Sequence, residues 1–135
     1  TQSTEEEKAR QEIQQELGLE PVGFGYLPEG WKFVRYDIDE QALCAMTFYS
    51  NDEIWMTVCA YKNQKENVSY NQFDGEVEMI ESIWTLQDTK IDIYQNGKAE
   101  EEGYTLMFEK NEDHYYCNVR LSYEEVKKIA EDIII

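Results

Sequence analysis

Three cysteines and one histidine are the residues of this chain that could build a metal site or a nucleophile. Cys44, Cys59, Cys117 and His114 lack the C-x-x-C spacing of a zinc site, which would need all four of them to converge. Cys117 and His114 are three residues apart in an expected strand, so their side chains point to opposite faces. The pattern favours small core residues and an exposed histidine. We therefore expect no metal, no cofactor and no Cys-His dyad.

The acidic residues offer one compact candidate for a hard cation. Asp37 and Asp39 alternate along an expected strand, so they share a face, and Glu40 follows them. The glycine and terminal glutamate of an EF-hand loop are missing, which favours a solvated turn. No pair of carboxylates is singled out for glycosidic hydrolysis. We assign no catalytic residue and expect a protein that is not an enzyme, and a hydrolase would need two carboxylates that converge in a cleft.

The composition indicates a folded and strongly anionic protein. The 135 residues include 29 acidic and 12 basic ones, a formal net charge of -17, while 41% are hydrophobic and 13% aromatic. Such a surface repels phosphate backbones and anionic lipids, so we expect no nucleic-acid partner. No apolar run approaches the ~20 residues that cross a bilayer, so this segment is not expected to insert in a membrane. The start at Thr1 fits a processed protein or a segment that follows a signal peptide or anchor.

Two helices are expected to flank a single domain. Residues 1–20 begin with a capping box, Ser3 and Glu6, and reach a stop at Gly18. Their apolar stripe is thin, so this helix either packs lightly on the body or forms the tail of a stalk. A second capping box, Ser122 and Glu125, opens the closing helix of the domain at 21–135. The expected apolar stripes are Ala9, Ile13 and Leu17 in the first helix and Val126, Ile129, Ala130 and Ile133 in the second.

Between the helices, short aromatic and β-branched segments alternate with turn signals, which predicts an antiparallel meander. The fold class is thus α+β, with a curved antiparallel sheet of about six or seven strands and a helix at each end. A turn at Asn111-Glu112 gives one hairpin an apolar face and a polar face, the latter pairing Glu109 with His114. The predicted apolar pairs are Tyr104 with Val119, Leu106 with Cys117 and Phe108 with Tyr115. The expected strands are 31–38, 42–50, 53–62, 76–86, 89–95, 104–110 and 114–121.

A second hairpin, turning at Asn51-Asp52, is predicted to be apolar on both faces. Its expected register pairs Phe48 with Trp55 and Cys44 with Cys59 on one face, and Tyr49 with Ile54 and Ala45 with Val58 on the other. This pairing leaves two alternatives open, a disulfide between Cys44 and Cys59 or two free thiols. An oxidising compartment would favour the bridge, whereas a hydrogen-bonded pair holds its Cβ atoms further apart than the ~3.8 Å that a disulfide prefers. The candidate ligand groove on this hairpin consists of Phe48, Trp55 and Tyr61.

Two motifs resemble a known bacterial family. Tyr26-Leu27-Pro28-Glu29-Gly30-Trp31 opens the resemblance, and Leu121-Ser122-Tyr123-Glu124-Glu125-Val126-Lys127-Lys128-Ile129-Ala130-Glu131 closes it. The chain is similar over about residues 24–134 to the domain of unknown function four-three-six-seven, with Trp31 in place of the usual Tyr and Asp132 in place of the usual Ser. The resemblance implies a domain that follows a transmembrane helix in Gram-positive bacteria, often in anti-sigma-factor-like proteins. It implies no catalytic residue.

These observations favour a non-enzymatic extracytoplasmic sensor or protein-interaction domain of a membrane-anchored bacterial protein. Its partner would be an extracellular ligand or protein, and its anchor an N-terminal segment outside this chain. The alternative is a carrier of a small molecule or lipid that uses the apolar groove of the curved sheet. A transmembrane helix before Thr1 in the full-length protein would support the sensor, and a signal peptide alone would support the carrier.

Overall fold

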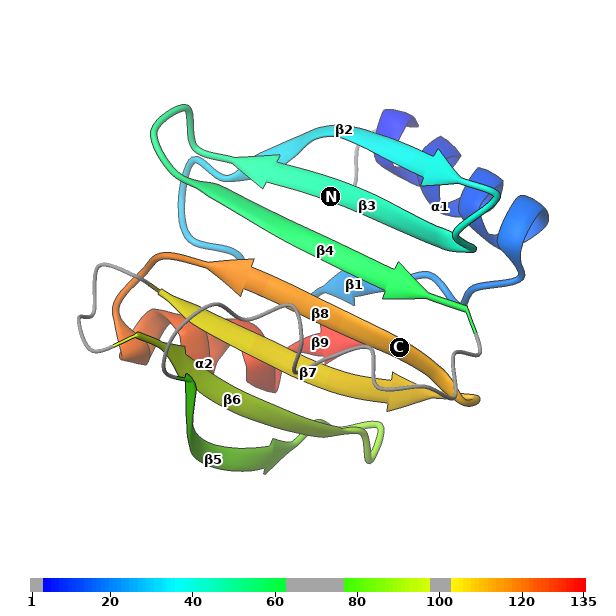
Figure 1. Cartoon of the computed structure of the whole chain (residues 1–135). Coiled ribbons are helices and arrows are strands. Elements are labelled where there is room, and N and C mark those ends of the chain that lie inside the picture. The colour runs from blue at the N-terminus through cyan, green and yellow to red at the C-terminus, as the bar shows by residue number, and fades with distance from the viewer. Residues whose placement is uncertain (1–3, 63–76, 98–102) are drawn as a thin grey trace.

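The computed structural model describes residues 4–62, 77–97 and 103–135. Two helices and nine strands follow one another along these residues, and seven strands form one antiparallel sheet (Figure 1). The α+β class is therefore confirmed, and the sheet is open. The elements are α1 (Thr4–Leu17), β1 (Gly23–Phe24), β2 (Lys32–Asp39), β3 (Cys44–Ser50), β4 (Trp55–Tyr61), β5 (Val77–Trp84), β6 (Lys90–Asn96), β7 (Tyr104–Lys110), β8 (Asp113–Val119), α2 (Tyr123–Glu131) and β9 (Ile133–Ile134).

The sheet consists of two meanders that meet in the middle. The strand order is β2-β3-β4-β8-β7-β6-β5, so β4 pairs with β8 and the next strand along the chain, β5, lies at the far edge. The sequence predicted a meander, in which each strand pairs with the next one along the chain. That prediction is wrong at the connection from β4 to β5, because these two strands are not neighbours in the sheet. Both edge strands are irregular, because a bulge interrupts β2 between Phe33 and Arg35 and β5 between Met79 and Glu81.

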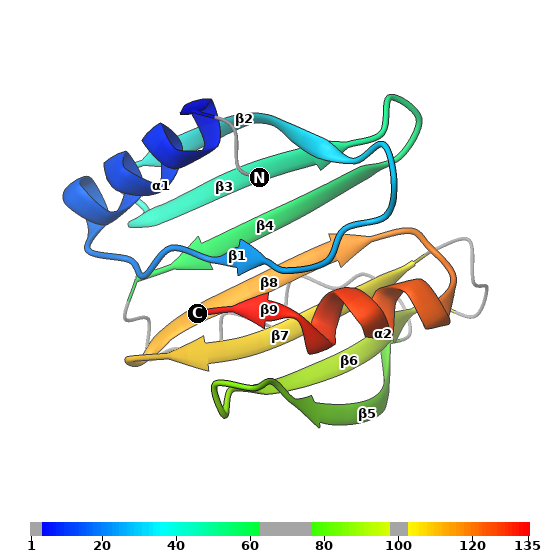
Figure 2. The ribbon, with the colours of Figure 1, turned by 180° about the vertical axis from the view of Figure 1, so that it is seen from behind.

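One face of the sheet carries the helices and the main core. Figure 2 shows α1 over the β2–β4 half, α2 over the β5–β7 half, and the short ribbon of β1 and β9 between them. Strand side chains that alternate toward this face are fully buried, among them Met56, Leu106 and Tyr115, and Ile129 of α2 is fully buried as well. Each large apolar side chain removed from water in this way contributes roughly 2 kcal/mol. The layer of helices and ribbon thus fixes which face of the sheet is covered.

The β7–β8 hairpin has the predicted register. Leu106 pairs with Cys117 and Glu109 with His114, while Phe108 stacks on Tyr115 with ring centroids 5.2 Å apart. The turn residues Asn111 and Glu112 both have positive φ, 53° and 70°. A two-residue loop of this kind matches the right-handed twist of the strands and so fixes the register.

The β3–β4 register differs by two residues from the predicted one. Cys44 pairs with Tyr61 rather than with Cys59, and all three cysteines are free thiols. The cause lies in the loop, which spans 51–54 because the Asn51 side-chain oxygen accepts from the backbone N–H groups of Glu53 and Ile54, at 3.0 and 2.8 Å. A shift of two keeps every side chain on its predicted face, so both faces of the hairpin are apolar as expected.

The closing helix begins where its capping box predicted. Ser122 is the N-cap, and its hydroxyl oxygen accepts from the backbone N–H of Glu125 at 3.3 Å. Val126 and Ile129 are buried as expected. Ile133 is also buried, but the prediction that it continues the helix is wrong, because the helix ends at Glu131 and Ile133 lies in β9, paired with Phe24.

The segment before β2 is tied to the closing helix. Pro28 and Trp31 are joined by a backbone hydrogen bond of 3.2 Å across a turn in which Gly30 has a φ of 89°, a conformation that favours glycine. The hydroxyl of Tyr26 donates to the carboxylate of Glu125 at 2.7 Å. The two motifs that are far apart in the sequence therefore meet in the fold.

The N-terminal helix packs on the sheet. Ala9, Ile13 and Leu17 are all buried, so the predicted stripe is confirmed, and the helix stops at Gly18, whose φ is 70°. Ser3 of the predicted capping box lies outside the described residues. Tyrosine hydroxyls of the sheet also hold the helix, since Tyr49 donates to Glu6 at 2.7 Å.

We predict that Ser122→Ala lowers the free energy of unfolding by about 1 kcal/mol, because the N–H of Glu125 loses its acceptor. Urea denaturation followed by circular dichroism measures this loss. Ser122→Asp keeps an acceptor at the same position and should retain the stability of the native chain. An alanine variant with the native midpoint would show that the cap contributes nothing.

Candidate functional site

The thiols and the histidine do not converge. Cys117 faces the main core and is fully buried, and His114 lies on the opposite face of β8, paired with Glu109. His114 lines an open hollow of about 430 Å³ together with Tyr116, Tyr94 and Asp92. Within the described residues, no three His, Cys, Asp or Glu side chains form a group that could hold a metal ion.

Burial makes the thiols poor nucleophiles. It raises the pKa of Cys59 from its ordinary value to about 11, and it raises the pKa of Cys44 and Cys117 as well. The thiolate is the reactive form of cysteine, so these side chains are almost wholly protonated near neutral pH. This arrangement fits packing better than covalent chemistry.

Two acidic residues at the end of β2 interact with residues close to them in the sequence. Asp37 forms an exposed ion pair with Arg35 at 2.6 Å, and Asp39 accepts from the backbone N–H groups of Gln41 and Ala42 at 3.1 and 3.0 Å. The carboxylate of Asp39 thus organises the turn. This is the solvated turn that the sequence favoured.

Two carboxylates with opposed pKa shifts lie on α1. A hydrogen bond from Tyr36 lowers the pKa of Glu12, and a hydrogen bond with Glu12 raises the pKa of Glu16. Opposed shifts of this kind can mark an acid and base pair. Glu16 is exposed on the helix and Glu12 is half-buried, and neither lines the two cavities beside α1 that are described below, so the pair lacks a cleft in which a substrate would lie.

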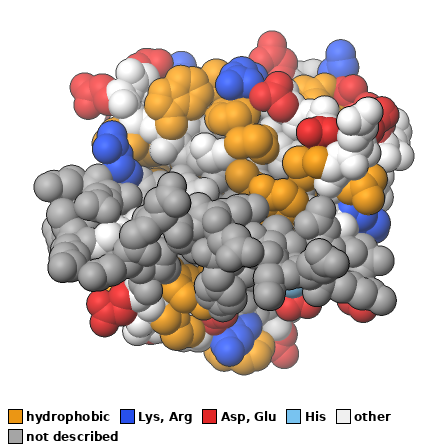
Figure 3. Space-filling model, in the orientation of Figure 1, with side chains coloured by type: hydrophobic (Ala, Val, Ile, Leu, Met, Phe, Trp, Pro, Cys, Tyr) orange, Lys and Arg blue, Asp and Glu red, His pale blue; other side chains and the backbone are white. Residues whose placement is uncertain are grey.

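The three residues of the expected groove share one face, opposite to the helices. Phe48 and Trp55 meet edge to face with centroids 6.3 Å apart, and the Trp55 side chain is half exposed. Tyr61 lies at the far end of β4 and packs against Tyr116. Figure 3 looks onto this face and shows hydrophobic side chains over its upper half. None of the three residues lines a cavity described here.

A cleft lies on the helix side of the described residues, where α1, β1 and the start of β2 approach β3. Its volume is about 550 Å³, which is within the range of sites for small molecules. Four aromatic side chains form much of its wall: Phe24, Trp31, Phe33 and Tyr49. We call this space the Arg10 cleft, because Arg10 of α1 reaches into it.

The aromatic walls of the Arg10 cleft support one another. Tyr49 is at the centre, with Phe24 at 5.4 Å and Phe33 at 6.0 Å between ring centroids, both edge to face. Edge-to-face contacts of this kind are favoured by the charge distribution of the rings. Tyr49 is also 2% exposed, and burial raises the pKa of its hydroxyl. The rings are therefore held in place before any ligand arrives.

Arg10 is held between α1 and β1. Its Nη2 atom lies 3.2 Å from Oε2 of Glu6 one turn earlier, and that carboxylate also accepts from Tyr49. The guanidinium lies over Gly23 of β1, where an added Cβ would be 3.3 Å from Nη2. A larger residue at position 23 would therefore press on the guanidinium.

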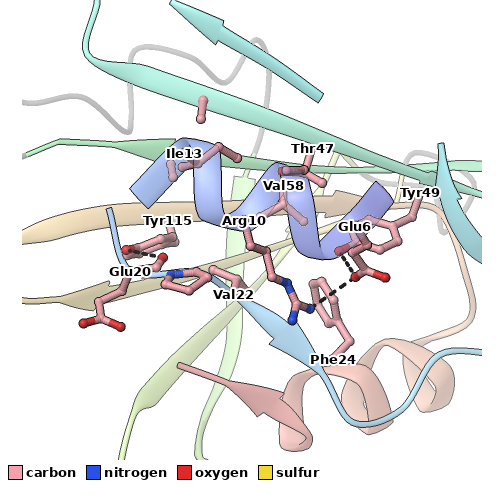
Figure 4. A pocket seen from close by; sticks show the side chains of 14 residues that line it. Glu6, Arg10, Ile13, Glu20, Val22, Phe24, Thr47, Tyr49, Val58 and Tyr115 are labelled. Carbon is pink, nitrogen blue, oxygen red and sulfur yellow. Dashed lines mark hydrogen bonds and ion pairs between the residues drawn. The ribbon is translucent and has the colours of Figure 1, made fainter. Parts of the chain in front are cut away.

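One atom of this arginine lacks a partner. Among the residues that the structure describes, Nε of Arg10 is the buried side-chain nitrogen or oxygen that has no hydrogen-bond partner. A buried donor without an acceptor costs about 1–3 kcal/mol. The same guanidinium borders a second, smaller cavity of about 30 Å³ between α1 and the sheet (Figure 4). Figure 4 shows Arg10 descending from α1 between Val22 and Phe24, with Glu6 and Tyr49 beside it.

Sequence reasoning missed this site. The Glu6 and Arg10 pair has the i, i+4 spacing that joins charges on a helix, so the ion pair itself could be predicted from the sequence. The position of this pair beside Trp31 and Phe33 could not be predicted, because it depends on how α1 crosses the sheet.

The fold and the cleft define an α+β domain with a layer of helices and one short ribbon on an open antiparallel sheet. The chain matches the family described as Domain of unknown function (DUF4367) over residues 21–133, and it belongs to that family. The resemblance expected from the two motifs is thereby confirmed. No curated protein matches the chain. The helix α1 precedes the matched residues, and neither described helix has the length and apolar character needed to cross a membrane.

We predict that native protein at neutral pH reacts slowly with a thiol reagent such as 5,5′-dithiobis(2-nitrobenzoate). Cys59 and Cys117 are buried, and Cys44 is half-buried. After denaturation without reductant, the titration should give three thiols per chain. One thiol would reveal a bridge between Cys44 and Cys59, and fast labelling of Cys117 in the folded protein would contradict its burial.

We also predict that the free energy of unfolding falls as the pH rises from 9 toward 11. The pKa of Cys59 is about 11 in the folded chain and about 8.5 when exposed. Because the unfolded chain ionises first, the stabilisation is complete below the unfolded pKa and is lost through this window. The loss for Cys59 amounts to roughly 2–3 kcal/mol. Urea titrations at several pH values measure it, and Cys59→Ala should make the dependence shallower.

Proposed function

We propose that this chain is a non-enzymatic sensor or protein-interaction domain of a membrane-anchored bacterial protein, and that it works outside the cytoplasmic membrane. Its partner would be an extracellular ligand or protein. The extracytoplasmic setting is supported by what the resemblance of the two end motifs implies.

The observation that carries this proposal is the composition of the Arg10 cleft. Its walls come from α1, which precedes the family match, and from β1, β2 and β3, which lie within it. A molecule bound in the cleft would touch both parts at once. Binding would therefore change how firmly α1 is held on the sheet, which is the coupling that a sensor requires.

The chemistry of the described residues supports binding rather than catalysis. The thiols are protonated near neutral pH because burial raises their pKa values, and the sole histidine lies away from them. The net charge of -17 disfavours anionic macromolecules as partners.

A carrier of a small molecule or lipid is the second candidate. The exposed contact between Phe48 and Trp55 favours it, because an aromatic pair with half of one ring system in solvent can be covered by an apolar ligand. Such a ligand would lie on the face opposite to the Arg10 cleft.

We predict that the domain is exported. Alkaline phosphatase fused after Ile135 of the full-length protein should be active in bacteria, and green fluorescent protein fused at the same position should be dark, because each reporter folds on one side of the membrane. Cell fractionation should place the fusion with the membrane. A fluorescent, soluble fusion would contradict both the extracytoplasmic location and the anchor.

A further inference from the structure

We propose that α1 is a releasable strap, a helix that leaves the sheet while the rest of the described chain stays folded. Its release regulates the Arg10 cleft, because Glu5, Glu6 and Arg10 of α1 form one wall of that cleft. The complete cleft therefore exists only while α1 is closed on the sheet. The use of this movement as a signal rests on the proposed function, whereas the movement itself depends on how α1 is packed.

The apolar contact between α1 and the sheet is small for the length of the helix. Of its 14 residues three are buried, Ala9, Ile13 and Leu17, and the last two are still 8% and 6% exposed. The nine residues of α2 bury the same number of side chains, and each of these is 0% exposed. Because burial of apolar area is what holds a short helix in place, α1 is the more weakly packed of the two described helices.

A cavity lies under α1. Its volume is about 30 Å³, and its lining includes Ala9 and Ile13 from the helix and Ala45, Val58 and Ala60 from the sheet (Figure 4). Atoms that border a void lose dispersion contacts, and a well-packed core has few such voids. The interface between α1 and the sheet is thus loosely packed where these side chains meet.

A buried donor adds a cost to the closed state. Among the described residues, Nε of Arg10 has no hydrogen-bond partner. The arginine belongs to α1, so water reaches this atom when the helix leaves the sheet. The hydrogen bond that water then supplies favours release, whichever way the atom points in the closed state. The ion pair with Glu6 does not oppose release, because both residues lie on α1 and move together.

Two tyrosine hydroxyls of the sheet offset this loose packing. Tyr49 of β3 donates to Glu6 in the first half of α1 at 2.7 Å, and Tyr36 of β2 donates to Glu12 in the second half. Neither bond involves the backbone of a strand, so both can break while the strands stay paired. The closed state of α1 therefore depends on these hydroxyls as well as on its apolar stripe.

The remaining elements have a core of their own. Figure 2 shows α2 over the β5–β7 half of the sheet, away from α1, and its Val126 and Ile129 are 0% exposed. The strand ladders of the sheet and of the β1 and β9 ribbon do not include α1. The family match also begins at residue 21, after α1. We therefore expect the sheet and α2 to stay folded when α1 is released.

The test is native-state hydrogen exchange of the whole chain, followed by NMR at several urea concentrations below the unfolding transition. The amides of residues 8–17, which are hydrogen bonded within α1, should have protection factors about 100-fold lower than those of β4 and β8. Their dependence on urea should also be smaller, because release of α1 exposes less surface than global unfolding. Equal protection factors and equal urea dependence in α1 and in these strands would overturn the proposal.

Two matched variants each remove one tyrosine hydroxyl that donates to a glutamate. Tyr36→Phe breaks the bond to Glu12 of α1, so the protection factors of the α1 amides should fall about tenfold. Tyr123→Phe breaks the bond from α2 to Glu81 of β5 and should leave the protection of α1 unchanged, even where it destabilises the strands. A fall of the same size in both variants would overturn the proposal, because α1 would then open only with the whole fold. If a variant fails to fold, the urea dependence of the native chain still decides the question.

Failure of this inference and failure of the proposed function can be told apart. A dark phosphatase fusion together with early exchange of α1 would contradict the extracytoplasmic sensor and leave the releasable helix intact. An active phosphatase fusion together with α1 amides that exchange as slowly as those of β4 and β8 would do the reverse.

Discussion

The ladder between β4 and β8 is the interaction on which the rest of the structure depends. It joins the meander that carries α1 to the meander that carries α2. Its central pairs are buried on both faces, with Val58 opposite Cys117 on one side and Cys59 opposite Tyr116 on the other. Because few polar side chains interrupt this seam, burial of apolar area holds it together. The two-stranded ribbon of β1 and β9 lies between the two helices, on the face of the sheet that the helices cover (Figure 2).

The sequence predicted the local structure well, because turns and alternation are local signals. All seven strands of the sheet lie within two residues of the expected ranges, and the Asn111-Glu112 turn fixed one register correctly. The error in the β3–β4 hairpin came from the Asn51 side chain, which enlarges the loop by its own hydrogen bonds. The β4–β8 pairing joins segments about sixty residues apart, and no local pattern specifies such a pairing.

The Arg10 cleft was beyond sequence reasoning for a related reason. Phe24, Trp31, Phe33 and Tyr49 come from three strands and the turn before the second, and each alone reads as an ordinary core residue. What makes them a site is the position of α1, whose buried stripe sets where Arg10 enters. The residues that the sequence predicted for a groove do share a face of the sheet: Phe48, Trp55 and Tyr61. A register shift of two residues leaves each side chain on the same face.

The bulges in β2 and β5 have a consequence for how the molecule behaves at high concentration. Both strands are edges, and an open sheet offers its unpaired backbone groups to a second copy of the chain. A bulge breaks the regular spacing of those groups and twists the strand, so an incoming strand cannot continue the ladder. The edges also carry exposed apolar side chains such as Val34, Met79 and Trp84. The irregular backbone thus protects against edge-to-edge aggregation where the side chains alone would invite it.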